Sequence, residues 1–169
     1  GIIPLAAVQE NIAIGWRNRR GASPWLRPYA EASGARDIIE TMRVKTASPA
    51  TPIATLSGGN QQKAVIGRWL MAQARILMLD EPTRGIDVGA RSEIYERMYG
   101  FAEAGGAVLF ASSDMAEVLG VADRIVVMRE GSVAGIVPRA EASADVLMRL
   151  ALPQAASTSS SSDRDVIPA

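Results

Sequence analysis

The chain has 169 residues, 48% of them hydrophobic and 21% charged, and its 18 basic side chains balance its 18 acidic ones. Such a composition is typical of a soluble globular domain that buries a core, and the zero net charge does not suggest a nucleic-acid or anionic-membrane partner. The absence of cysteine and histidine excludes disulfides, thiolate catalysis, serine–histidine nucleophiles and most zinc sites, which leaves carboxylates, hydroxyls, amides and an oxygen-bound hard cation for any chemistry.

The first part of the chain is predicted to be mainly helical. A short helix is expected over residues 8–17, followed by a basic surface loop over 17–28 and a second helix over 30–44. The breaker cluster at residues 48–52 then precedes a third helix, which Leu56-Ser57-Gly58-Gly59 opens. The apolar positions of this third helix are Val65, Ile66, Trp69 and Leu70.

From residue 75 onward, strands and helices alternate. The apolar runs 76–79 and 107–111 indicate strands buried on both faces. Between them, a helix is expected to carry Ile94, Met98 and Phe101 on one side and to end at Gly105-Gly106. The pattern then predicts a short helix with a capping box at Asp114 and Glu117, a strand over 125–128, and a turn at 130–131 into residues 133–137.

This alternation indicates an α/β fold with a parallel sheet. Its active groups are expected at the carboxyl ends of the strands, where Asp80, Glu81 and the pair Ser112-Ser113 fall. The predicted division is a helical subdomain over residues 1–73 and a sheet core over 74–152. Residues 153–169 lack a periodic apolar face and are expected to form a disordered tail.

The sequence Ser57-Gly58-Gly59 has the features of an anion receptor. Amides at the start of a helix are unpaired and the helix dipole is positive there, while glycines let a phosphate approach and the Ser57 hydroxyl adds a donor. The alternative is that Ser57 is an ordinary N-cap and that the glycines end a loop. Leu56 and the following Asn60-Gln61-Gln62-Lys63 favour the anion receptor.

Asp80 and Glu81 follow a buried strand, at an edge where water and a cation can enter. Because adjacent strand residues point to opposite sides, the two carboxylates suit different tasks, one holding magnesium and the other orienting water. A solvated Asp-Glu turn is the alternative. Asp87 is a candidate helix cap as well as a candidate site residue, and both roles can hold together.

Three ordered motifs resemble the ATP-binding cassette of an ABC transporter: residues 56–63, residues 76–89 and residues 112–120. They are most similar to the second cassette of the tandem ATPase subunits of bacterial monosaccharide importers of the ribose, xylose and galactose type. The resemblance covers about residues 1–151. It implies a P-loop NTPase-like partial domain, in which a helical signature subdomain precedes a parallel-sheet core that lacks its N-terminal strands.

The resemblance also implies roles for individual residues. Ser57, Gly58 and Gly59, with Gln61, would be the signature that contacts ATP held by the opposing cassette. Asp80 would be the Walker B ligand of Mg²⁺ and Glu81 the catalytic carboxylate. Asp87 would belong to the D-loop over residues 85–87, at the interface between cassettes.

Two features depart from the family pattern. The phosphate-binding sequence Gly-x-x-x-x-Gly-Lys-[Ser/Thr] occurs nowhere in the 169 residues, so we expect a piece of a longer protein that does not turn over ATP alone. Ser113 stands where most cassettes place a switch histidine. The second cassettes of these sugar importers resemble this chain in that substitution. A hydroxyl cannot become cationic near neutral pH, so the site with Asp80 and Glu81 is expected to be the weaker of a pair.

The leading hypothesis is an ATP-hydrolysing part of a sugar importer, located in the cytoplasm on the inner face of the membrane. Its implied partners are a second cassette, transmembrane permease subunits and, indirectly, a periplasmic sugar-binding protein. The basic residues of 17–27, with Trp16 and Trp25, would either face the permease or form a solvated loop. Two alternatives are a non-catalytic module that lends its signature to a partner cassette and a nucleic-acid-associated ABC ATPase, although no nucleic acid is expected.

Overall fold

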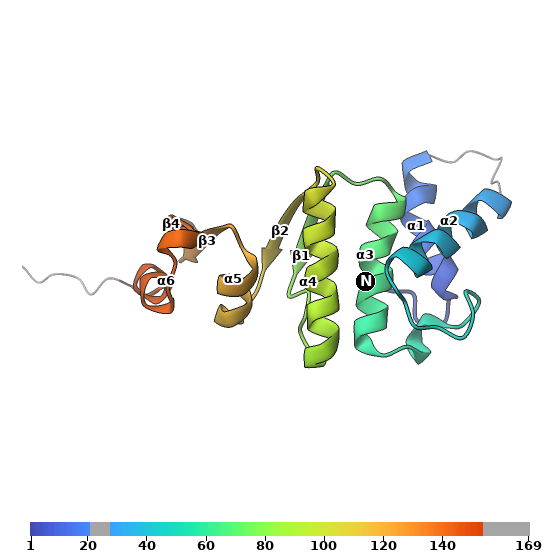
Figure 1. The fold of residues 1–169 in the computed structure, drawn as a ribbon, viewed down its shortest axis with the longest axis horizontal. Coiled ribbons are helices and arrows are strands. Elements are labelled where there is room, and N and C mark those ends of the chain that lie inside the picture. Colours follow the sequence, from blue (N-terminus) through green and yellow to red (C-terminus); the bar gives the residue numbers. More distant parts are fainter. Residues whose placement is uncertain (21–27, 154–169) are drawn as a thin grey trace, which may run out of the picture. The chain divides into compact units, whose positions relative to one another are not determined.

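The computed structural model describes residues 1–20 and 28–153, and contacts within the chain divide it into two compact units, Gly1–Ser113 and Asp114–Ala169 (Figure 1). The predicted boundary between residues 73 and 74 falls inside the first unit and stays a prediction about subdomains. Except for residue 153, the predicted tail lies outside the described residues.

Three helices pack together at the start of the first unit: α1 (Val8–Arg20), α2 (Pro28–Thr41) and α3 (Gly58–Met71), with a 3₁₀ turn at Ile53–Thr55 before α3. They confirm the three predicted helices. Helix α1 continues to Arg20, so the first residues of the predicted basic loop are helical. Arginine has a high helix propensity, which favours this extension. Residues 21–27 of that loop, including Trp25 and Arg27, lie outside the described residues, and so do the side chains of Arg19 and Arg20.

Close packing and charge hold these helices together. A side chain at Gly67 of α3 would overlap Ile38 of α2 at 2.4 Å, so glycine allows the two helices to approach. Arg17 of α1 pairs with Glu31 of α2, and this hydrogen bond raises the pKa of Arg17. Of the apolar positions named for α3, Ile66 is buried, whereas Trp69 is 45% exposed.

A buried polar cluster ties the N-terminal segment to α3. Asn11 is fully buried. The Ile3 N–H donates to Asn11 Oδ1 at 2.8 Å, and Asn11 Nδ2 donates to the Ile3 carbonyl at 3.0 Å. Arg68 donates from Nε to the Asn11 carbonyl at 2.7 Å and from Nη1 to the Gly1 carbonyl at 2.8 Å. Burial lowers the pKa of Arg68. These bonds satisfy groups that would otherwise be costly to bury.

The first unit also contains a parallel strand pair, β1 (Ile76–Asp80) and β2 (Ala107–Ala111), connected through α4 (Val88–Glu103). The prediction that these strands are buried on both faces is wrong. Leu77 and Leu79 are buried, but Ile76, Met78 and Leu109 are 64%, 76% and 56% exposed. Alternate side chains point to opposite faces, and among the described residues the face carrying Leu77 and Leu79 is the covered one.

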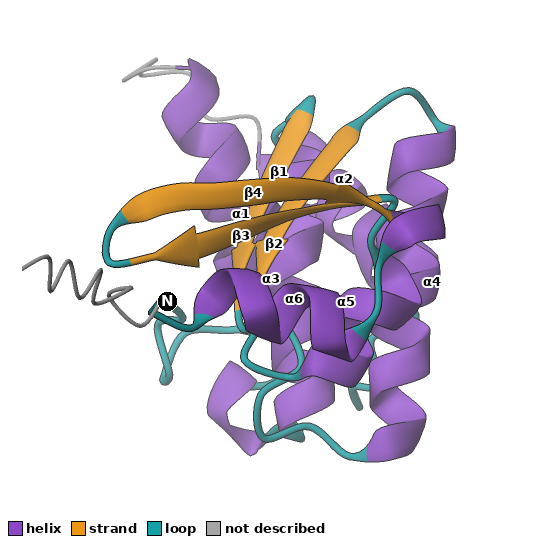
Figure 2. Ribbon diagram, turned by 90° about the vertical axis from the view of Figure 1, so that its left-hand side faces the viewer, coloured by secondary structure: helices purple, strands orange, loops and turns teal. Residues whose placement is uncertain are grey.

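The second unit contains α5 (Met115–Val121), the antiparallel strands β3 (Arg124–Arg129) and β4 (Ser132–Pro138), a 3₁₀ turn (Arg139–Glu141) and α6 (Ala144–Ala151). Figure 2 shows the hairpin, whose turn has positive φ angles at Glu130 and Gly131. The third predicted strand thus pairs with β4 in a two-stranded antiparallel sheet. Helix α6 was not predicted. Its Leu147 packs into the core with Ile125, Val127 and Val137.

Candidate functional site

The pocket between α3 and α4

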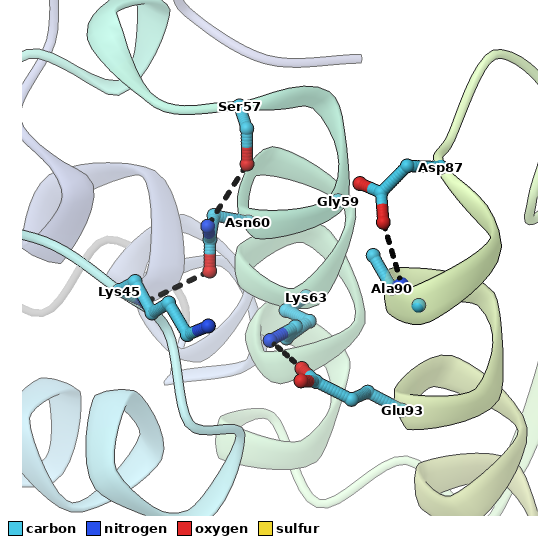
Figure 3. Close-up of a pocket in the computed structure, with 9 residues that line it drawn as sticks. Lys45, Ser57, Gly59, Asn60, Lys63, Asp87, Ala90 and Glu93 are labelled. Carbon is cyan, nitrogen blue, oxygen red and sulfur yellow. Dashed lines mark hydrogen bonds and ion pairs between the residues drawn. The ribbon is translucent and has the colours of Figure 1, made fainter.

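The helices α3 and α4 lie side by side and start at the same end (Figure 1). A side chain on Gly59 would come within 2.8 Å of the Ala90 side chain, so only glycine allows these two helix starts to approach this closely. The two starts and the loop before α3 enclose a pocket of about 310 Å³. Its lining residues are Lys45, Ser57, Gly59, Asn60, Lys63, Asp87, Gly89, Ala90 and Glu93 (Figure 3).

At one end of this pocket, Asn60 links Ser57 to the loop before α3 (Figure 3). The Asn60 Nδ2 donates to Ser57 Oγ at 2.9 Å, and the Lys45 N–H donates to Asn60 Oδ1 at 2.8 Å. Ser57 precedes the first residue of α3, but its side chain accepts no hydrogen bond from the helix amides. The first amides of α3 therefore receive no side-chain cap from Ser57.

The two glycines of the predicted anion receptor differ in their surroundings. Gly58 is exposed, and the nearest atom to a side chain placed there would be the Gly85 carbonyl oxygen at 3.8 Å. This open space fits the expectation that a phosphate can approach the backbone. Gly59 is buried, and its contact with Ala90 gives it a packing role of its own. Gln61 lies outside the lining set, and its Nε2 donates to the Leu56 carbonyl at 2.8 Å.

Asp87 lies at the same end of the pocket as Ser57, at the start of α4 (Figure 3). Its carboxylate accepts from the Ala90 N–H at 2.9 Å, which is the geometry of an N-cap. The capping role considered for Asp87 is therefore present, and the exposed carboxylate also lines the pocket.

An ion pair between buried Lys63 and partly exposed Glu93 lies at the other end of the pocket. Lys63 is 2% exposed, and its Nζ donates to the Glu93 carboxylate and to the Arg43 carbonyl at 3.1 Å. The hydrogen bond from Lys63 holds the pKa of Glu93 below its ordinary value. Lys63 lies six residues beyond Ser57, and Glu93 lies six residues beyond Asp87. The ion pair therefore fixes the register of α3 against α4.

The carboxylates at the strand ends

Asp80 is the last residue of β1 and is exposed, opposite Ala111 of β2 in the parallel register. Glu81 lies beyond the strand, with a φ of 47°. A left-handed conformation in a residue other than glycine costs about 1 kcal/mol and is often found at functional sites. Glu81 therefore lies in a turn beyond the strand, so the alternation along a strand that was expected for Asp80 and Glu81 does not apply to this pair.

The end of β2 holds Glu81 on two sides. The Glu81 N–H donates to the Ala111 carbonyl at 2.9 Å, and the Ser113 N–H donates to Glu81 Oε1 at 2.9 Å. The structure therefore brings together two of the predicted catalytic residues, Glu81 and Ser113, at the carboxyl ends of neighbouring parallel strands. One carboxylate oxygen of Glu81 is anchored, and Ser113 is exposed.

Within residues 1–20 and 28–153, no three acidic, histidine or cysteine side chains come together as a metal site. Magnesium bound with a nucleotide needs only one or two protein carboxylates, because phosphates and water supply its other ligands. An exposed carboxylate at the end of β1 fits that limited demand. Asp80 is thus a suitable single ligand for Mg²⁺.

Sequence reasoning did not single out six of the nine pocket residues as site residues: Lys45, Asn60, Lys63, Gly89, Ala90 and Glu93. Asn60 and Lys63 were noted only as parts of the motif that follows Gly59. Their partners are 15 and 30 residues away in the chain, so no local pattern indicates these contacts. A lysine among the buried residues of α3 is a sequence signal of such a contact, and Arg68 is the other charged residue buried on that helix.

Comparisons with known proteins

A parallel strand pair with carboxylates at its ends, and a helix that Ser57 precedes and Gly58-Gly59 begins, agree with the cassette that the sequence motifs resemble. Residues 2–84 match the family described as ABC transporter. The chain belongs to this family of ATP-binding cassettes, and its fold is the corresponding part of the P-loop NTPase fold. In the part of the chain that the structure describes, no helix is both long enough and apolar enough to span a bilayer.

Similar curated proteins are sugar-import proteins by name. The arabinose import ATP-binding protein AraG of Pseudomonas savastanoi pv. phaseolicola is 52% identical over 155 residues, which cover 91% of this chain and 31% of the relative. The arabinose import ATP-binding protein AraG 2 of Burkholderia ambifaria is 51% identical over 158 residues, covering 91% of this chain and 30% of the relative. The chain thus spans about a third of the length of these relatives.

Solved structures show the same fold. An ATP-binding cassette of an ABC transporter, MJ1267, aligns with a TM-score of 0.74 at 24% identity, covering 89% of this chain and 65% of that one. The dimeric cassette MJ0796 in a post-hydrolysis state bound to ADP and phosphate aligns with a TM-score of 0.69 at 23% identity, covering 82% of this chain and 59% of that one.

Proposed function

We propose that this chain forms part of the ATP-hydrolysing subunit of an ABC importer for monosaccharides, with arabinose as the first sugar to test. The names of its relatives support the transport reaction, and the site residues support the chemistry. In this proposal the subunit binds ATP with Mg²⁺ and works with a second ATP-binding cassette and membrane permease subunits. A periplasmic sugar-binding protein acts indirectly, and the subunit sits on the cytoplasmic face of the membrane.

The observation that carries the proposal is the contact between Glu81 and Ser113. With Oε1 held by the Ser113 N–H, the other carboxylate oxygen of Glu81 is left to orient a water molecule or accept its proton. Asp80, one residue earlier, would hold the magnesium ion. When bound, ATP would supply the phosphoryl group and Mg²⁺ would neutralise the charge that develops on it.

Ser57 and Gly58 act at a different place in the same reaction. Their exposed position at the start of α3 suits a phosphate oxygen, because backbone amides and a hydroxyl are donors and the helix dipole favours an anion. In this proposal they contact ATP that the opposing cassette holds, while Asp87 lies at the interface between the cassettes. The role of Gln61 in nucleotide binding stays a prediction.

Ser113 is expected to make the site of Glu81 the weaker of two. Its hydroxyl can donate one hydrogen bond to a phosphate oxygen but carries no positive charge, whereas a histidine can become cationic. Introducing histidine at this position should therefore raise rather than abolish turnover.

A chimera tests the proposed function. Residues 1–152 of this chain replace the matching segment of the Pseudomonas savastanoi arabinose import ATP-binding protein, and ATP hydrolysis and arabinose uptake are measured with its permease. We expect activity in the chimera and a loss of about 100-fold or more with Glu81→Gln, the usual range for removing a positioned acid or base.

The matched control is Glu103→Gln, which removes an exposed carboxylate at the far end of α4. It should leave both activities unchanged. A chimera that neither hydrolyses ATP nor imports arabinose would contradict the proposal. If Glu81→Gln and Glu103→Gln behaved alike in an active chimera, the role of Glu81 would be wrong and a non-catalytic module would be favoured.

A further inference from the structure

We propose that Asn60 is a positioning residue that turns the hydroxyl proton of Ser57 outward, toward the phosphate oxygen that Ser57 is to meet. This inference rests on the proposed function, since it concerns how one donor of the ATP site is oriented. Asn60 itself contacts no nucleotide in this account. It acts through Ser57, and the loop residue Lys45 fixes Asn60 in turn.

The orientation of the Asn60 amide follows from its two partners. The backbone N–H of Lys45 can only donate, so the atom of Asn60 that faces it at 2.8 Å must be the carbonyl oxygen Oδ1. The other end of the amide is then the Nδ2 group, which donates to Ser57 Oγ at 2.9 Å. A flipped amide would place two donors face to face at Lys45.

The direction of the Ser57 proton follows from this bond. Because Ser57 Oγ accepts a hydrogen from Asn60, its own hydrogen cannot point along the same line. Ser57 is exposed whereas Asn60 is half-buried, so the remaining directions lead toward solvent and the pocket. The hydroxyl is thus held as a donor before any ligand arrives, which lowers the entropy cost of binding.

Three other α-helix caps within the described residues differ from the arrangement at Ser57. Asp87, Asp114 and Ser143 each accept a hydrogen bond from an amide of the helix that they precede. Ser57 does not, and Asn60 occupies its oxygen instead. Both the hydroxyl proton and the first amides of α3 are therefore left to an anion.

Two substitutions separate orientation from simple contact. In Asn60→Asp, the carboxylate still accepts from Lys45 but now also accepts the Ser57 proton, which turns the donor inward and adds a negative charge. We expect the KM for ATP of the chimera to rise by about tenfold to 100-fold, as for a lost hydrogen bond to a charged group. Asn60→Ala leaves the hydroxyl free to rotate and should raise the KM about threefold to tenfold.

The decisive measurement is a double-mutant cycle between Asn60→Ala and Ser57→Ala in the chimera. If Asn60 acts through Ser57, Asn60→Ala has no further effect on the KM once the hydroxyl is gone. The exposed Glu103 at the end of α4 offers the control, and Glu103→Gln should change nothing. Additive effects of the two alanine substitutions would overturn the proposal, whereas an inactive wild-type chimera would contradict the proposed function instead.

NMR spectroscopy of the 169-residue protein tests the two hydrogen bonds of Asn60, to Lys45 and to Ser57, independently of activity. Hydrogen exchange at the Lys45 amide should be at least about tenfold faster in Asn60→Ala and unchanged in Asn60→Asp, which keeps the acceptor. Ser57→Ala should shift the side-chain amide resonances of Asn60. Unchanged Lys45 exchange in Asn60→Ala, or unshifted Asn60 resonances in Ser57→Ala, would refute the proposed orientation.

Discussion

The ion pair between Lys63 and Glu93 gives the sharpest prediction for stability, because its two partners are not equivalent. Lys63 is 2% exposed, whereas the Glu93 side chain is 34% exposed. Removing Glu93 leaves a buried ammonium group without its counter-ion. Removing Lys63 leaves a carboxylate that water can reach, together with the Arg43 carbonyl, which loses one donor.

The expected costs differ accordingly. Breaking a fully buried pair by removing one partner costs about 3–5 kcal/mol, and the partial exposure of Glu93 lowers our expectation for Glu93→Gln to about 2–3 kcal/mol. Lys63→Met keeps the buried stem and loses the hydrogen bonds, at a cost of about 1 kcal/mol. In the double variant no buried charge remains, so its stability should be close to that of Lys63→Met alone.

Urea unfolding followed by tryptophan fluorescence measures these costs. All three tryptophans, at positions 16, 25 and 69, belong to the unit Gly1–Ser113, so the signal reports that unit alone. Glu103→Gln, a change of the same chemistry on the exposed end of α4, serves as the control. If Lys63→Met proved as costly as Glu93→Gln, or more so, the argument from burial would be wrong.

Two further predictions concern packing and pH. Gly59→Ala places a methyl group 2.8 Å from Ala90 and should cost about 1–3 kcal/mol in the same unfolding assay, whereas Gly58→Ala enters open space and should lower ATP hydrolysis with little loss of stability. Equal stability of the two variants would contradict the close contact. The pKa of Glu93 is lowered from its ordinary 4.5 by the bond from Lys63, so its contribution is complete above about pH 4.5 and is lost as the pH falls through the lowered value. Glu93→Gln should therefore lose less stability than the wild type between pH 6 and pH 3, and equal losses would refute this linkage.

The sequence was most informative where local pattern decides structure. Helix α4 could be placed because Ile94 and Met98 repeat at helical spacing, and both are buried. The positions of Glu81 and Ser113 could be predicted because each follows an apolar strand, and parallel strands bring their carboxyl ends to one edge.

Contacts between distant segments were beyond such reasoning. The bonds of Asn60 to Lys45 and of Lys63 to Glu93 depend on how α3 lies against the loop and against α4, which no local period encodes. The exposure of Met78 was missed for a similar reason, because an apolar run does not show whether one face of the sheet or both are covered. Helix α6 was missed although Ser143 provides a cap signal before it.

The central claim is that this chain brings both a phosphate donor, Ser57, and a water-orienting carboxylate, Glu81, to composite ATP sites. A crystal structure of the chimera with a non-hydrolysable ATP analogue and Mg²⁺ tests it most directly. We predict Ser57 Oγ at hydrogen-bond distance, about 2.5–3.0 Å, from a γ-phosphate oxygen and Glu81 beside the γ-phosphate of a bound nucleotide. A structure with either residue remote from every bound triphosphate would contradict the account.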